Sequence, residues 1–144
     1  MLFRSDAAPA ADLAALLEAQ RDLWTGLLDV TTEVDAAAAA AAAEDAGALD
    51  ALDTLVTECL SNAVRHGRAT AVSIRVGVAG PASGTVGGSR RLALEVADDG
   101  VGGQGEPGLG TAIFDSLSVA WTREARADGG LRVRLEVPAA ARRG

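Results

Sequence analysis

Two polar residues, Glu58 and Asn62, lie four positions apart in the stretch TECLSNAVRHG, residues 57–67. Residues four apart share one face of a helix, so the carboxylate and the amide would point the same way. A carboxylate can act as a general base, and an amide oxygen is a suitable ligand for Mg²⁺. Arg65 and His66 extend the same ridge towards any bound phosphate. On these residues alone, an ordinary solvated helix face remains the competing interpretation.

A second group of candidate residues lies in VADDGVGG, residues 96–103. An apolar, strand-like pattern ends there in Asp98 and Asp99, and Gly100 and Gly102 follow closely. Glycine lets the backbone approach a ligand, and a carboxylate at a strand end can accept a hydrogen bond from an exocyclic amine. A plain acidic turn is the alternative.

A third motif is the sequence GLGT, formed by Gly108, Leu109, Gly110 and Thr111. It precedes a short amphipathic pattern, so it would open a helix, where backbone amides are suited to binding phosphate. Gly-x-Gly is a common sequence, and the motif is weak on its own.

Hydrophobic periodicity predicts the elements that would position these motifs. Helical spacing predicts helices over residues 11–26 and 48–66, and a short helix after residue 110. The alanine run 36–43 predicts a surface helix, with a linker as the alternative. Asp35 is placed to cap this helix, and Gly47 is placed to break it.

Alternating apolar residues predict five strands, of which the second and third are joined by a glycine-rich loop and the last two by a short turn. The order is helix, strand, helix, helix, strand, strand, helix, strand, strand. This order predicts an α+β two-layer sandwich, with a mixed, mostly antiparallel sheet and helices on one face. We expect residues 1–27 to form a helical segment or linker and residues 28–144 to form the main domain.

Composition narrows the function further. The chain has 144 residues, a net charge of −7 and no basic cluster, which argues against nucleic-acid binding. No apolar run approaches the roughly 20 residues of a membrane span, so we expect no membrane contact within this chain and a cytoplasmic location. One cysteine and one histidine cannot form a zinc site. We interpret Cys59 as a core residue, and Trp24 and Trp121 as packing residues.

In this order and at these separations, the three motifs together resemble the ATP-binding domain of the GHKL superfamily, which includes gyrase, Hsp90, histidine kinases and MutL. E-x-x-x-N resembles the N box, D-x-G-x-G the first glycine box and G-x-G the second, over roughly residues 28–138. NAVRHG and GLG are most similar to the catalytic domain of bacterial two-component sensor histidine kinases. The anti-sigma-factor serine kinases share these boxes and are the nearest alternative.

The resemblance implies a role for each matching residue. Asn62 would coordinate the Mg²⁺ that bridges the ATP phosphates, and Glu58 would be the general base. Arg65 and His66 would lie near the phosphates, and Asp98 would accept a hydrogen bond from the adenine amino group. The remaining nucleotide contacts would come from Gly100, Gly102, Gly108, Leu109, Gly110 and Thr111.

The resemblance also implies an activity, the transfer of the ATP γ-phosphate to a histidine for two-component signalling. The only histidine, His66, belongs to the N box, so the acceptor would lie on a dimerisation domain absent from this chain. We therefore expect a truncated N-terminus, a homodimeric intact protein that could be membrane-anchored upstream, and a response regulator as partner. If the chain is complete, a serine kinase of a sigma-factor pathway protein, or a non-catalytic ATP-binding module, is favoured.

Two features depart from the pattern of the resembling family. The segment GQGEP between the glycine boxes is short, so any lid over the nucleotide would be minimal. Leu131 stands where the family often has a threonine that supports the adenine contacts.

Overall fold

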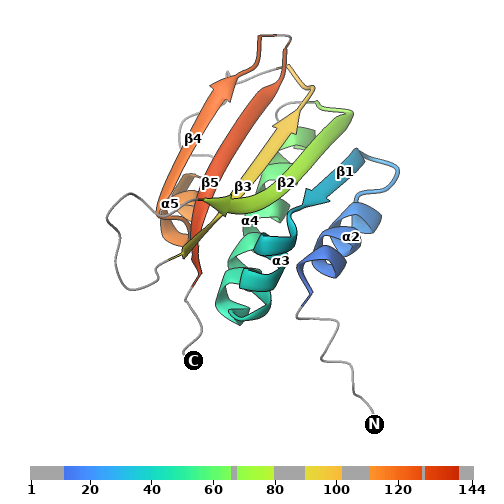
Figure 1. Ribbon diagram of the computed structural model, residues 1–144. Helices are drawn as coiled ribbons and strands as arrows, with labels where there is room; N and C mark the ends of the chain where they lie inside the picture. The colour runs from blue at the N-terminus through green and yellow to red at the C-terminus, as the bar shows by residue number, and fades with distance from the viewer. Residues whose placement is uncertain (1–11, 66–67, 80–89, 102–110, 128, 140–144) are drawn as a thin grey trace.

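The computed structural model describes residues 12–65, 68–79, 90–101, 111–127 and 129–139. Its helices and strands follow the predicted order along the chain (Figure 1). The helices are α2 (Leu13–Leu23), α3 (Ala36–Ala43), α4 (Ala46–Arg65) and α5 (Thr111–Leu117). The strands are β1 (Asp29–Val34), β2 (Ala71–Ala79), β3 (Arg90–Asp98), β4 (Ala120–Ala125) and β5 (Leu131–Ala139).

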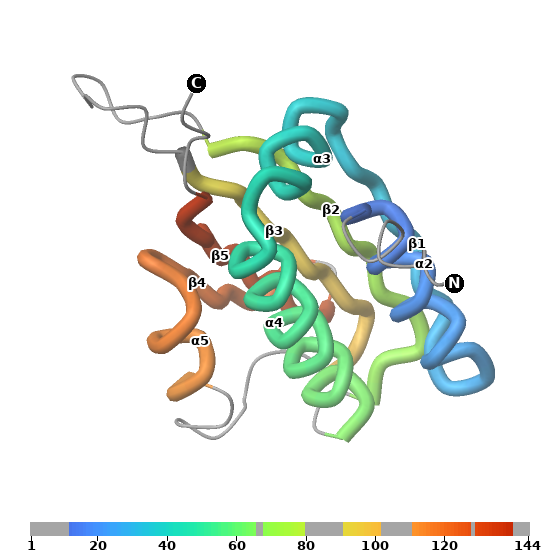
Figure 2. The backbone as a smooth tube through the Cα atoms, turned by 90° about the horizontal axis from the view of Figure 1, so that it is seen from below, coloured from blue at the N-terminus to red at the C-terminus, as the bar shows by residue number. Residues whose placement is uncertain are grey.

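The strands form one five-stranded sheet in the order β1-β2-β3-β5-β4. β1 runs parallel to β2, whereas the other neighbouring pairs are antiparallel. A parallel pair needs a long crossover connection, which α3 and α4 provide. The helices cover one face of the sheet, and α4 crosses its middle with α5 on the β4 side (Figure 2). The predicted α+β sandwich with a mixed, mostly antiparallel sheet is therefore confirmed.

The core lies between α4 and the sheet. On β3, Leu92, Leu94 and Val96 alternate into this layer and are each at most 3% exposed. Residues at helical spacing on α4 meet them from the other side, and the buried ones are Ala48, Leu49, Leu52, Leu55, Val56, Cys59, Leu60 and Ala63. The two periodicities read from the sequence therefore converge on one hydrophobic core.

The boundary between α3 and α4 differs from the prediction. Gly47 does not separate them but lies in the first turn of α4, which begins at Ala46. The side chain of Asp45 accepts a hydrogen bond from the Ala48 N–H at 3.0 Å, so a capping aspartate starts the helix. Glycine this close to a helix start costs little, because the first turn lacks most of its internal hydrogen bonds.

The prediction that Asp35 caps α3 is wrong for its side chain. Asp35 occupies the N-cap position but makes no capping hydrogen bond. Its carboxylate lies over β2 instead, where a Cβ added to Gly77 would be 2.8 Å from Asp35 Oδ2. Because glycine has no side chain, Gly77 leaves the space that the Asp35 carboxylate occupies over β2.

α2 and α3 both contribute to the core. The alanine run is a helix, as predicted, but it does not simply lie on the surface, because Ala38, Ala41 and Ala42 are buried. Leu13 and Leu17 of α2 are fully buried in the same core. The division of the chain near residue 28 stays a sequence-based prediction. No helix in the described part of the chain is long and apolar enough to cross a membrane.

Candidate functional site

The C-terminal half of α4 carries the Glu58–Asn62 ridge. Both residues are half-buried, beside the apolar stripe that holds the helix on the sheet. The Asn62 Oδ1 atom is buried and has no hydrogen-bond partner among the described residues. An unsatisfied buried carbonyl oxygen is costly, so such an atom points to a binding partner outside the described chain. A hard cation such as Mg²⁺ is a suitable partner for an amide oxygen.

Asp98 lies at the end of the buried face of β3. It continues the alternation of Leu92, Leu94 and Val96 and is only 7% exposed. Its Oδ1 accepts a hydrogen bond from the Gly100 N–H at 2.8 Å. The period of the strand therefore places a carboxylate in the layer next to α4, where a core residue would otherwise stand.

Cys59 shows that the ridge on α4 and the end of β3 lie close together. Burial, together with the smaller effect of the negative charges of Glu58 and Asp98, raises the pKa of its thiol to about 12. Both carboxylates therefore act on the same buried sulfur atom. The structure thus places Glu58 and Asp98 near one buried side chain, and Asn62 follows Glu58 by about one turn of α4.

Asp99 has a structural contact that the sequence did not reveal. Its Oδ1 accepts hydrogen bonds from the backbone N–H groups of Thr70 (2.8 Å) and Ala71 (3.0 Å), and its Oδ2 bonds the Thr70 hydroxyl (2.7 Å). These bonds lower the pKa of Asp99 to about 2. Asp99 thereby ties the loop after β3 to the start of β2, directly beside Asp98.

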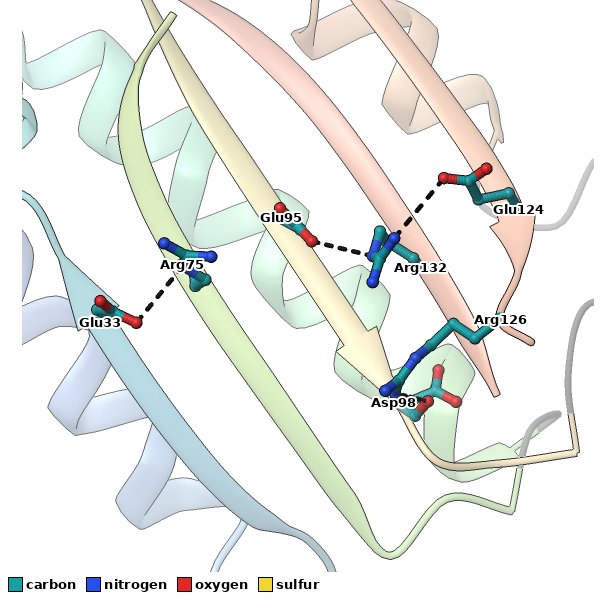
Figure 3. Close-up of polar contacts among 7 residues, drawn as sticks. All are labelled: Glu33, Arg75, Glu95, Asp98, Glu124, Arg126 and Arg132. Atoms are coloured by element: carbon teal, nitrogen blue, oxygen red, sulfur yellow. Dashed lines mark hydrogen bonds and ion pairs between the residues drawn. The ribbon is translucent and has the colours of Figure 1, made fainter. Parts of the chain in front are cut away.

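The turn between β4 and β5 also reaches the site, again without a clear sequence signal. Arg126 Nη1 donates a hydrogen bond to the backbone oxygen of Asp98 at 2.9 Å (Figure 3). Gly130 packs against the same oxygen from within the turn. Residues 126 and 98 are far apart in sequence, so only the strand order brings them together.

The other predicted site residues are less fully described. Arg65 is exposed at the end of α4, Gly100 is half-buried, and Thr111 is the first residue of α5. α5 is anchored by Phe114, whose ring packs edge-on against Trp121 with centroids 5.1 Å apart. The predicted contacts of His66, Gly102, Gly108, Leu109 and Gly110 lie outside the described residues.

Leu131, the departure noted in the sequence, is the cross-strand partner of Asp98 on β5. Directly opposed residues of an antiparallel pair carry their side chains on the same face. Leu131 is half-buried and packs against the core. Asp98 therefore has an apolar neighbour where a threonine would have offered a hydroxyl.

One hollow of about 250 Å³ lies away from this site, on the open face of the sheet, where Glu33, Arg75, Glu95 and Arg134 are among its lining residues. The Arg75 Nε atom lies 3.4 Å from Glu33 Oε1, so these two opposite charges in the hollow compensate each other (Figure 3).

Comparison with solved structures identifies the fold. A histidine kinase domain of a blue-light activated histidine kinase from Erythrobacter litoralis matches with a TM-score of 0.55 and 22% identity over 89% of this chain. The histidine kinase domain of the E. coli osmosensor EnvZ matches with a TM-score of 0.56 and 18% identity over 92% of this chain. The ATP binding domain of PrrB from Mycobacterium tuberculosis matches with a TM-score of 0.57 and 19% identity over 90% of this chain.

The chain spans 61% of the Erythrobacter domain, 89% of the EnvZ domain and 96% of the PrrB domain. In sequence comparisons, no protein-family model and no curated protein matches the chain. At identities of 22% or less, the similarity concerns the fold. The chain has the fold of histidine kinase ATP-binding domains, and the resemblance stated from the sequence motifs is confirmed at that level.

Proposed function

We propose that the chain is the ATP-binding kinase domain of a bacterial sensor histidine kinase. It binds ATP with Mg²⁺ and transfers the γ-phosphate to a histidine on a dimerisation domain. The observation that carries this proposal is the buried Oδ1 of Asn62, which has no hydrogen-bond partner among the described residues and lies four residues after Glu58. Two motifs distant in sequence are also near one another, because Glu58 and Asp98 both act on the buried Cys59, and the fold is one that histidine kinases use.

The proposed roles follow from the position of each residue. Asp98 accepts a hydrogen bond from the adenine amino group, because its carboxylate lies in a dry layer where a satisfied bond is strong. Asn62 Oδ1 would hold Mg²⁺, which neutralises phosphate charge when it is bound. No cluster of three or more His, Cys, Asp or Glu occurs in the described part of the chain. This fits a cation that takes one protein oxygen and otherwise binds phosphate and water.

Glu58 is the proposed general base. It lies one helical turn before Asn62 on α4, so it would face the end of the triphosphate that Asn62 helps to fix. A base in this position accepts the proton of the attacking group while the phosphate is transferred. Arg65, His66 and the glycine boxes complete the phosphate contacts in this proposal.

An anti-sigma-factor-type serine kinase is the second candidate, with a non-catalytic ATP-binding module as a third. The serine kinase is favoured by the same three motifs, which the two kinase classes share. The acid stability of the phosphorylated product distinguishes the two kinases, because phosphohistidine is acid-labile and phosphoserine is not. The chain alone should show little autophosphorylation, and acid-labile label on His66 would contradict the proposed roles.

Nucleotide binding tests the proposal. Affinity can be measured by titration with a fluorescent ATP analogue in the presence of Mg²⁺. Asp98→Asn, which alters the acceptor of the adenine amine, should bind the analogue roughly tenfold more weakly than the wild type, or weaker still. Asn62→Asp should weaken binding similarly, because it adds a negative charge beside Glu58 and the phosphates. Asp50→Asn is a matched control, since Asp50 is exposed on the same helix. Equal affinities for the wild type and both site variants would refute the proposal.

A further inference from the structure

The β4–β5 turn is built against the backbone of Asp98. Within the turn, the Arg126 N–H donates to the Gly130 oxygen at 3.0 Å, and the Gly129 N–H donates to the Arg126 oxygen at 3.1 Å. From this closed turn, Arg126 Nη1 reaches back to the Asp98 oxygen at 2.9 Å. The guanidinium group thus holds the last residue of β3 from outside the strand (Figure 3).

Gly130 makes the second contact with Asp98. It is buried and has a φ of +98°, and a Cβ at this position would be 2.0 Å from the Asp98 oxygen and 3.1 Å from Asp99 Cα. Only glycine allows the turn to approach this closely without displacing Asp98. Gly129 has nearly the same φ of +95°, yet a Cβ there would meet nothing within 4 Å.

These two contacts restrain the backbone of Asp98 and, through it, the position of the carboxylate, whose Oδ1 also accepts the hydrogen bond from the Gly100 N–H. The peptide oxygen and the side chain of Asp98 belong to the same residue, so a displaced backbone also displaces Oδ1 and Oδ2. A hydrogen bond weakens steeply once its angle departs from linear, and small shifts therefore matter. Leu131, the cross-strand neighbour of Asp98, has no hydroxyl group to donate a hydrogen bond. The turn instead supplies a hydrogen bond to Asp98, from Arg126.

We infer that Arg126 and Gly130 are positioning residues that set the preference of this site for adenine. The inference rests on the proposed role of Asp98 as acceptor of the adenine amine. Arg126 and Gly130 act through Asp98 and do not touch the nucleotide. They therefore govern discrimination between purine bases more than the binding of the phosphates.

The test compares ATP with inosine triphosphate, whose base carries a carbonyl oxygen in place of the amine. Isothermal titration calorimetry with Mg²⁺ measures both affinities for the full chain. The wild type should prefer ATP by roughly tenfold or more. Arg126→Met should lose most of this preference, and Arg126→Lys, which keeps one donor, should restore part of it. A variant that was only less stable would lose affinity for both nucleotides alike.

Two controls separate the contact from general effects. Gly130→Ala and Gly129→Ala share the strain of a left-handed backbone, but only Gly130→Ala collides with Asp98. Arg132→Met removes the ion pairs with Glu95 and Glu124 next to the turn without touching Asp98. We expect reduced base preference in Gly130→Ala and wild-type preference in both controls.

The inference is overturned if Arg126→Met keeps the wild-type preference for ATP. It is also overturned if Gly129→Ala reduces the preference as much as Gly130→Ala does. Should Gly130→Ala fail to fold, the Arg126→Met and Arg126→Lys pair decides the question. A wild type that binds neither nucleotide, or both equally, would instead contradict the proposed role of Asp98 and remove the basis of the inference.

Discussion

Cys59 lies at the centre of the proposed site although it takes no part in the proposed chemistry. It is 6% exposed, and the charges of both Glu58 and Asp98 act on its thiol. Burial and these negative charges disfavour the thiolate, so the residue stays a neutral core side chain at physiological pH.

At alkaline pH, the change in the stability of the chain with pH should come almost entirely from ionisation of the Cys59 thiol. The sequence contains no lysine and no tyrosine, so few other groups titrate between pH 9 and 11. Folding raises the pKa of Cys59 from 9.0 to about 12, so its contribution to stability is complete below pH 9 and is lost as pH rises towards 12. The free energy of unfolding, measured in urea, should fall by up to about 1.4 kcal/mol per pH unit above 9.

Cys59→Ala provides the control for this prediction. The variant is expected to be less stable at every pH because it leaves a small cavity, but its stability should stay flat across the same alkaline range. An equal alkaline decline in the wild type and in Cys59→Ala would show that another group is responsible.

Asp99 should affect the pH dependence of stability in the opposite direction, in the acid range. Its folded pKa is lowered from 3.8 to about 2, so its stabilising effect is present above pH 4 and is lost as pH falls towards 2. Asp99→Asn should be less stable than the wild type at pH 6, and the two stabilities should converge near pH 2. Thermal unfolding across this range measures the difference, and a gap that persists undiminished at pH 2 would contradict the assigned pKa.

At the scale of the elements, α2 and α4 are joined by a buried amide. Gln20 is 5% exposed, and its Nε2 donates to Asp53 Oδ1 and to the Thr57 hydroxyl, each at 2.7 Å. Its Oε1 accepts a hydrogen bond from the Trp24 indole at 3.2 Å. Thr57 directly precedes Glu58, so this network ties α2 to the part of α4 that carries the proposed site.

Gln20→Leu tests how strongly α2 is coupled to the rest of the chain. The variant leaves Asp53 and Thr57 without their buried donor, and we expect a loss of about 1–3 kcal/mol in the free energy of unfolding. Glu18→Gln is the control, because its ion pair with Arg21 is more than half exposed and contributes little. An unchanged unfolding midpoint for Gln20→Leu would indicate that α2 unfolds separately, as a division of the chain near residue 28 would allow.

Local patterns predicted the elements well and their connections less well. The alternation that buries Leu92, Leu94 and Val96 also placed Asp98 in the helix-facing layer, so the key carboxylate was predictable. Contacts between residues about thirty positions apart could not be predicted from the sequence, and examples are Asp99 with Thr70 and Arg126 with Asp98. They depend on strand order and on the antiparallel pairing of β3 with β2 and with β5, which no local periodicity encodes.

At the scale of the whole molecule, the sheet has two different faces. One face is covered by helices and holds the proposed site between α4 and the end of β3. The open face carries charged residues that pair across strands, such as Arg132 with Glu95 at 3.0 Å and Arg91 with Glu136 at 2.8 Å. Such exposed pairs contribute little stability, but they keep this face polar. The buried Oδ1 of Asn62, which has no hydrogen-bond partner among the described residues, therefore differs from the paired charges of the open face.

The coupling between Mg²⁺ and ATP at Asn62 tests the central claim most directly. Calorimetry of ATP binding with and without Mg²⁺ should show that the cation strengthens binding to the wild type by roughly tenfold or more. Asn62→Ala should lose most of this gain, whereas Asp98→Asn should weaken binding by a similar factor under both conditions. If Asn62→Ala keeps the full Mg²⁺ dependence of the wild type, the proposed site is contradicted.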